Sequence, residues 1–154
     1  MAAFSQSMTV GVPATPVAAG ATGNATVRFA GTNIAGAQLR LCYNAAILTP
    51  GTPVVPAGLA GLVCNAPTAG NCPAPATNGI NCAGFVATGV WTFPQDITFP
   101  FTVAAGATGT STALAFGSPP VPLFSDGDGN DVTPTTTGAN FPYAGVVTTP
   151  PTVT

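Results

Sequence analysis

The most constraining feature of this sequence is a strict period-two alternation at residues 37–43, AQLRLCY. The side chains at positions 37, 39, 41 and 43 fall on one side of an extended chain, and the Gln, Arg and Cys between them fall on the other. This pattern is typical of a strand with one face in a hydrophobic core. Other short alternating segments follow, separated by clusters of Gly, Pro, Asn and Thr, and none has helical periodicity. The sequence therefore predicts an all-β fold.

The segments with strand character divide the chain into one β-sandwich domain over residues 1–154. We expect an N-terminal arm and first strand at residues 1–12, and further strands at 24–29, 37–43, 85–93, 96–103, 110–116 and 141–147. Pro100 cannot donate to a sheet ladder, which places its strand at an edge or a bulge. Residues 50–84, rich in Pro and holding three of the four cysteines, are predicted to be one long loop. A shorter loop is expected at 119–134, and a tail at 148–154.

Charged side chains are unusually scarce, since the 154 residues include two arginines, four aspartates and no other charged residue. Disorder is not expected, because 46% of residues are hydrophobic and the net charge is only −2. A surface with so few charges has little electrostatic protection against association, which favours a subunit that packs against copies of itself. Two arginines cannot neutralise a nucleic-acid backbone. No apolar run reaches the roughly 18 residues of a membrane-spanning helix.

Four cysteines, at positions 42, 64, 72 and 82, predict two disulfides and an extracellular location. Three pairings are open, and we favour Cys42 with Cys64 and Cys72 with Cys82, which would fasten the long loop. A four-cysteine zinc site is the alternative. The spacing contains no Cys-x-x-Cys pair, which argues against zinc.

The one concentration of acidic residues lies at residues 125–131, SDGDGND. Asp126, Asp128 and Asn130 occupy alternate positions, and Asp131 follows, so several oxygens can face one hard cation. The loop is not an EF-hand, because that motif requires Gly at position 131 and an acid at position 137. A calcium site is one interpretation. A solvated Asp/Gly turn is the other.

Catalytic chemistry is poorly supplied, because the chain has no His, Glu or Lys to serve as acid or base. We therefore predict that the protein is not an enzyme. Asn24 begins an Asn-Ala-Thr glycosylation sequon. Four aromatic residues are either a sugar-stacking platform or core residues, and the core is favoured: Tyr43, Trp91, Phe93 and Tyr143.

The order of several segments resembles cohesin-like modules and, more broadly, carbohydrate-binding-module-like extracellular β-sandwiches. The segments that carry the resemblance are MTVGV at 8–12, ATVRF at 25–29, NIAGAQLRLCYNAAIL at 33–48 and FPFTVAAGATGTSTAL at 99–114. The resemblance implies a secreted jelly-roll β-sandwich of about nine strands that binds a dockerin through a sheet face. Two features depart from the family pattern. Asn44 stands where an Asp is common, and the cysteine-rich insert has no counterpart.

Two functions are consistent with these observations. The first is a structural subunit of an extracellular, pilus-like filament that donates a terminal strand to the next copy. The N-terminal arm is the preferred donor, through the apolar residues Phe4, Met8, Val10 and Val12, and the strand around Val147 is the second choice. The alternative is a monomeric cohesin-like adhesion module that recognises a dockerin, another surface protein or a glycan.

Overall fold

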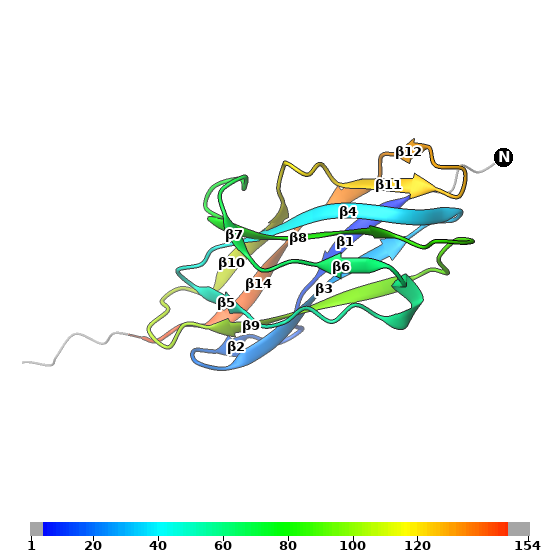
Figure 1. Ribbon diagram of the computed structural model, residues 1–154. Coiled ribbons are helices and arrows are strands. Elements are labelled where there is room, and N and C mark those ends of the chain that lie inside the picture. The colour runs from blue at the N-terminus through cyan, green and yellow to red at the C-terminus, as the bar shows by residue number, and fades with distance from the viewer. Residues whose placement is uncertain (1–4, 148–154) are drawn as a thin grey trace, which may run out of the picture.

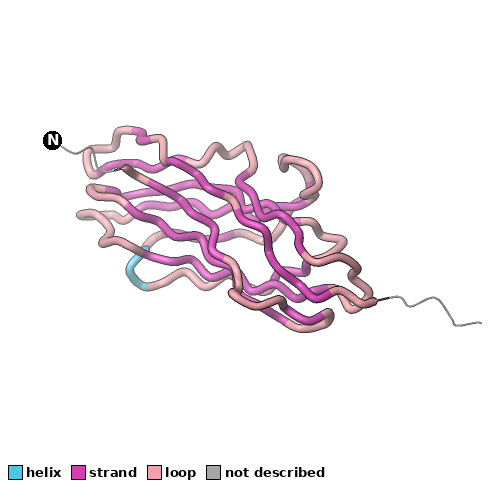
Figure 2. Tube along the Cα trace, turned by 180° about the vertical axis from the view of Figure 1, so that it is seen from behind, coloured by secondary structure: helices cyan, strands magenta, loops and turns pink. Residues whose placement is uncertain are grey.

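The structure is a computed structural model that describes residues 5–147. Two β-sheets pack face to face into an elongated sandwich (Figure 1). The first sheet has the strand order β13 (Thr135–Thr137), β1 (Ser7–Gly11), β3 (Thr22–Ala30), β9 (Gln95–Val103) and β5 (Leu48–Pro50). The described chain begins and ends at opposite ends of the long axis (Figure 2), and its short 3-10 helix spans Ala57–Leu59.

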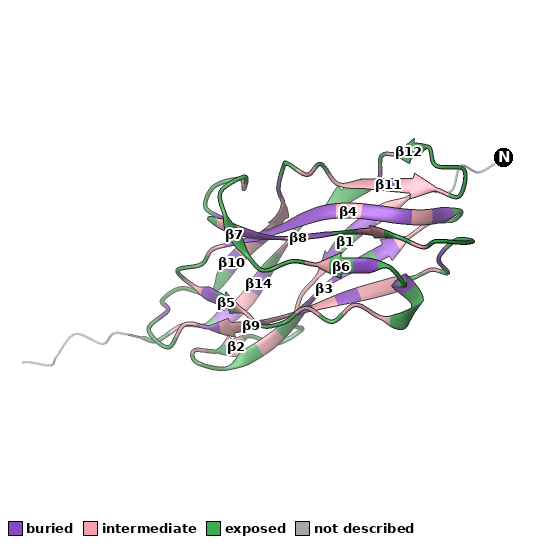
Figure 3. Cartoon of the chain, in the orientation of Figure 1, coloured by how far each residue is buried: buried purple, intermediate pink, exposed green. Residues whose placement is uncertain are grey.

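The second sheet is centred on β4. Its continuous path runs through β12 (Asp131–Val132), β11 (Leu123–Asp126), β4 (Ile34–Tyr43), β10 (Ser111–Phe116), β14 (Ala139–Ala144) and β2 (Val17–Ala18). On the other edge of β4 lies β8 (Asn78–Phe85), which in turn pairs with β6 (Leu62–Cys64) and β7 (Thr68–Ala69). The all-β fold and the strand predicted at residues 37–43 are thus confirmed, and β4 is buried along most of its length (Figure 3).

The core lies between the sheets and is built by the predicted alternation. In β9 the odd-numbered residues from Ile97 to Val103 are fully buried, and the residues between them are partly exposed. Aromatic contacts join the layers: the rings of Phe29 in β3 and Phe124 in β11 meet edge to face at 5.2 Å. Each such buried side chain contributes about 1.5–3 kcal/mol through removal of apolar surface from water.

Pro100 lies inside the first sheet, in continuous register with β3 on one side, and β5 lies on the other side of its strand. Its carbonyl accepts a hydrogen bond from the amide of Gly51, so its backbone polar atoms face the β5 side. The β5 ladder ends at Pro50, which pairs with Phe101, so Pro100 lies one residue past that ladder and its missing proton costs no ladder hydrogen bond. The predicted edge or bulge was therefore unnecessary.

Three sequence predictions of secondary structure were wrong. The expected loop at 50–84 ends in β8, which pairs with β4 over eight residues and places Phe85 at the end of a strand. Residues 86–93, expected to continue a strand, form none. The expected loop at 119–134 contains β11 and β12. With these short segments, the described residues hold fourteen strands, where about nine were expected.

The N-terminal arm belongs to the chain's own sheet. Strand β1 pairs with β3 on one edge and with β13 on the other. Met8 and Val10 are buried in the core, and Val12 packs against it. These residues fill their own sandwich, so the described part of the arm does not support the prediction that they are donated to a neighbouring copy, which stays a prediction. Phe4 and the 148–154 tail lie outside the described residues.

Candidate binding face

The outer face of the second sheet is organised in rows of side chains that cross its strands. One row follows the register from Phe85 in β8 through Gly36 in β4 and Ser125 in β11 to Asp131 in β12. The next row runs through Val63, Ala83, Gln38 and Leu123. Directly paired residues share a face of the sheet, so these eight residues form one surface, which we call the open face.

The open face exposes apolar side chains to an unusual degree. Phe85 is 71% exposed and Val63 is 60% exposed, and Val121 beside them is 58% exposed. An aromatic side chain left in water has no role in the core, and a grouping of exposed apolar side chains on one face marks an interaction site. Gln38 contributes polarity and donates a hydrogen bond from Nε2 to the carbonyl of Val121 at 3.0 Å.

Phe85 stands between three hollows of the surface. One, of about 240 Å³, lies over Gly36 and reaches Ser125 and Asp131. A second, of about 330 Å³, lies toward Gly61 and Thr88. The third, of about 360 Å³, lies toward the β11–β12 turn. Hot spots of protein interfaces are typically aromatic anchors beside pockets, and Phe85 has this geometry.

The other half of the same sheet face is covered. Segment 65–77, which we call the strap, leads from β6 through β7 to β8, and beneath it Arg40 and Cys42 are 1% and 0% exposed. The Arg40 guanidinium donates to Oγ1 and the carbonyl of Thr68, to the carbonyl of Gly70 and to Oδ1 of Asn81, at 2.7–2.9 Å. Its Nε is the one buried side-chain polar atom of residues 5–147 without a partner.

Arg40 holds the strap with a charge that no carboxylate balances, because its acceptors are two carbonyls, a hydroxyl and an amide oxygen. Gly79 makes room for this arrangement, since a Cβ there would lie 2.6 Å from Nε of Arg40. The strap itself buries almost nothing apolar; Ala76 is its one buried residue. It is therefore fastened by hydrogen bonds and a disulfide rather than by packing.

The two predicted disulfides are present, but their pairing differs from the favoured one. Cys42 bonds to Cys72 and Cys64 bonds to Cys82. The favoured pairing assumed that 50–84 is a loop without strands. Because β6 and β8 lie side by side, Cys64 and Cys82 are direct cross-strand neighbours. Cys42 is then left for Cys72 at the tip of the strap. With every cysteine in a disulfide, the four-cysteine zinc site is not formed.

The acidic turn borders the open face. Oδ1 of Asp126 accepts hydrogen bonds from the amides of Asp128 and Asn130, both at 2.9 Å, and its Oδ2 lies 3.2 Å from Nδ2 of Asn130. These bonds to the ionised form lower the pKa of Asp126. Within residues 5–147, no three acidic, Cys or His side chains form a group able to hold a metal. The calcium site with Asp131 is thus not preformed and stays a prediction.

The remaining predicted site residues lie apart from the open face. Asn24 is exposed in the middle of β3, on the outside of the first sheet. Tyr43, Trp91 and Tyr143 are at most 4% exposed, so they are core residues and form no sugar platform. Asn44 closes the turn after β4, because its Oδ1 accepts from the amide of Ala46 at 3.0 Å, a role that Asp fills equally well.

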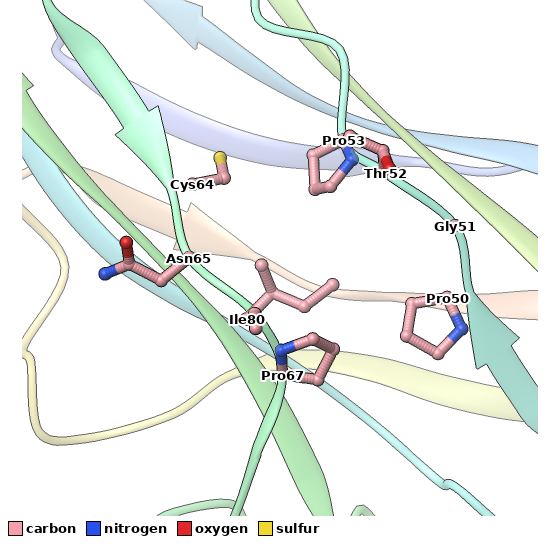
Figure 4. Close-up of a pocket in the computed structure, with 9 residues that line it drawn as sticks. Pro50, Gly51, Thr52, Pro53, Cys64, Asn65, Pro67 and Ile80 are labelled. Atoms are coloured by element: carbon pink, nitrogen blue, oxygen red, sulfur yellow. The ribbon is translucent and has the colours of Figure 1, made fainter.

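A further cleft, of about 370 Å³, opens at the side of the sandwich between the end of β5 and the end of β6 (Figure 4). Pro50, Pro53 and Pro67 surround it, and Ile80 lies among them. Neither a charged nor an aromatic side chain is among its lining residues. Its polar side chains are those of Thr52 and Asn65, and it therefore offers a ligand neither an ion pair nor aromatic stacking.

The fold is matched by solved structures of low sequence identity. The sixth cohesin of scaffoldin B from Acetivibrio cellulolyticus, in complex with the Cel5 dockerin, superposes with a TM-score of 0.73 at 13% identity, covering 91% of this chain and 99% of that one. This chain has a cohesin-like fold. A cohesin in a type I cohesin–dockerin complex from Clostridium thermocellum has a TM-score of 0.70 at 11% identity, with coverage of 91% and 99%.

A non-cellulosomal cohesin from the archaeon Archaeoglobus fulgidus also superposes on this cohesin-like chain, with a TM-score of 0.68, 17% identity and 91% of each chain covered. No protein-family model and no curated protein sequence matches the present chain. Among the described residues, no helix is long and apolar enough to cross a membrane. The structural likeness thus confirms the predicted jelly-roll sandwich, and it reaches no further than the fold.

Sequence reasoning missed the open face because it missed β8. That strand, NGINCAGF at 78–85, contains two glycines and two asparagines, which are poor strand formers. One signal was available: Ile80 and Cys82 alternate with Asn81, Ala83 and, at the end, Phe85. This alternation places Phe85 on the side opposite the core.

Proposed function

We propose that this protein is a non-enzymatic, extracellular binding module whose open face, anchored by Phe85, docks a protein partner of the dockerin kind. The observation that carries the proposal is the exposed aromatic side chain, flanked by three hollows, on the outer face of a cohesin-like sheet. Solved neighbours with this fold include cohesins in complex with dockerins, which supports the class of partner. Two disulfides support an oxidising, extracellular setting.

A pilus-like filament is the weaker reading. It was motivated by scarce charge and by an apolar N-terminal strand, and that strand is paired on both edges in its own sheet. The open face instead exposes two large apolar side chains, Phe85 and Val63, in adjacent rows. A docking face of this kind serves a partner without any exchange of strands.

The test is a binding measurement with purified dockerin modules from Acetivibrio cellulolyticus and Clostridium thermocellum, immobilised on a sensor surface. Phe85→Ala is expected to weaken the binding of whichever module is recognised by at least about 30-fold, the roughly 2 kcal/mol of an interface hot spot. Val63→Ala should weaken it by a smaller factor. Val54→Ala is the matched control, because Val54 is also 60% exposed but lies on a segment that bridges to β9 of the other sheet.

The variants should all fold, since the truncated side chains are exposed, and thermal melting checks this. Binding that Phe85→Ala and Val54→Ala affect equally would show that the partner uses another surface. A panel in which no dockerin binds would remove the dockerin class from the proposal.

A further inference from the structure

One row of the open face has an apolar side chain at one end and an acidic side chain at the other. Phe85, Gly36, Ser125 and Asp131 are successive cross-strand neighbours in four adjacent strands. Strands lie about 4.8 Å apart, so the row spans about 14 Å from the first strand to the fourth. Gly36 adds no side chain between the two ends. A partner lying along this row therefore meets both Phe85 and Asp131.

The charges around this face are all of one sign. Three of the four aspartates of the chain lie in the β11–β12 turn at the end of the row: Asp126, Asp128 and Asp131. Asp126 is turned inward, onto the amides of its own turn, whereas Asp128 and Asp131 are exposed. Among residues 5–147 the ion pair is Arg28 with Asp96, so neither exposed carboxylate is paired with a cation of the chain.

Both arginines are unavailable to this face. Arg28 forms a two-pronged ion pair with Asp96 on the first sheet, at 2.8 and 2.9 Å. Arg40 is on the same sheet face as Phe85, but it is 1% exposed and its guanidinium is bonded to the strap. The chain has no lysine. Within residues 5–147, a second copy of this chain thus offers no unpaired side-chain cation to the acidic end.

From these charges we infer that the partner of the open face places an apolar side chain beside Phe85 and a Lys or Arg side chain against Asp131 and Asp128. This inference rests on the proposed binding function and specifies the chemistry of its partner. The basic residue should lie one to two helical turns from the apolar one, about 5–11 Å, or two to three strand residues from it, about 7–10 Å, in either chain direction. The long stem of Lys or Arg bridges the remaining distance along the row.

The experiment selects binders from a random twelve-residue peptide library on the immobilised protein, in chelator so that the turn holds no metal. Selected peptides are expected to be enriched in Lys or Arg close to an apolar residue. The affinity of a synthetic peptide of the enriched sequence should fall roughly 3- to 10-fold for Asp128→Asn/Asp131→Asn at low salt, and less at 0.5 M salt. Asp96→Asn, which removes one acid on the other sheet where the double variant removes two, should leave the affinity unchanged.

The outcomes separate the inference from the function on which it rests. Peptides that need Phe85 but show no basic enrichment, and that bind Asp128→Asn/Asp131→Asn as tightly as the parent, overturn the inference and leave the binding face standing. A library that yields no binder dependent on Phe85 counts against the binding face itself. A loss of affinity for Asp96→Asn in proportion to the charge it removes would reduce the effect to net charge and overturn the specific contact.

Discussion

The buried guanidinium of Arg40 offers the sharpest test of how the covered half of the sheet is held. Arg40→Met keeps most of the apolar stem and removes four hydrogen bonds, to Thr68, Gly70 and Asn81. Hydrogen bonds to a charged group contribute about 1.5–3 kcal/mol each when considered singly, but the freed acceptors partly recover water. The change also removes the cost of burying a charge without a counter-ion.

These opposing effects leave an expected net loss of about 2–3 kcal/mol, because most of the acceptors belong to the strap, which water can reach once released. In a chain of this length the loss corresponds to a fall of about 4–12 °C in Tm. Gln38→Met is the matched control. It lies on the same strand and face two residues earlier and donates a single hydrogen bond, to Val121, so its Tm should change by no more than about 2 °C.

Differential scanning calorimetry measures the two melting temperatures, and hydrogen exchange locates the change. Two amides of the strap should exchange faster in Arg40→Met. The amide of Gly70 donates to the carbonyl of Thr77, and the amide of Asn65 donates to the carbonyl of Asn81. The reasoning is refuted if Arg40→Met has the same Tm as Gln38→Met and the amides of its strap exchange at the rates of the unmodified protein. In that case the cost of burying the cation equals the gain from its hydrogen bonds.

Three further outcomes are expected. Cys42→Ala/Cys72→Ala opens a disulfide of sequence separation 30, for which the loop-entropy estimate is about 3.6 kcal/mol, and should lower Tm by about 7–14 °C; an unchanged Tm would contradict this. Because the pKa of Asp126 is lowered in the folded chain, its contribution to stability is complete above the ordinary carboxyl pKa and is lost as pH falls through the folded one. Unfolding followed across acidic pH should therefore show a decline that Asp126→Asn flattens, and identical profiles would show that its turn does not bind the ionised form more strongly. If the turn holds calcium, an excess of 100 times Kd stabilises the fold by about 2.7 kcal/mol over chelator, and an identical Tm in both would set the calcium prediction aside.

The fold class was readable from local pattern, because alternation reports which side of a strand meets the core. The segments at 37–43, 96–103 and 110–116 became β4, β9 and β10 with small shifts in their ends. The two disulfides were also foreseen from an even cysteine count. Sequence could not foresee β8 or the cysteine pairing, since both depend on which strands become neighbours, and that is a contact between residues far apart in the chain.

The sequence alone determined that this is a weakly charged β-sandwich with two cross-links and without His, Glu or Lys. The position of the candidate site was decided only by tertiary structure. Pairing of β8 with β4 brought Phe85 into a row with Asp131, and the strap over Arg40 left half of that sheet face open. The physical reason is that composition and periodicity are properties of single segments. A binding face is formed by the register between several strands, and the close packing of the whole sandwich sets that register.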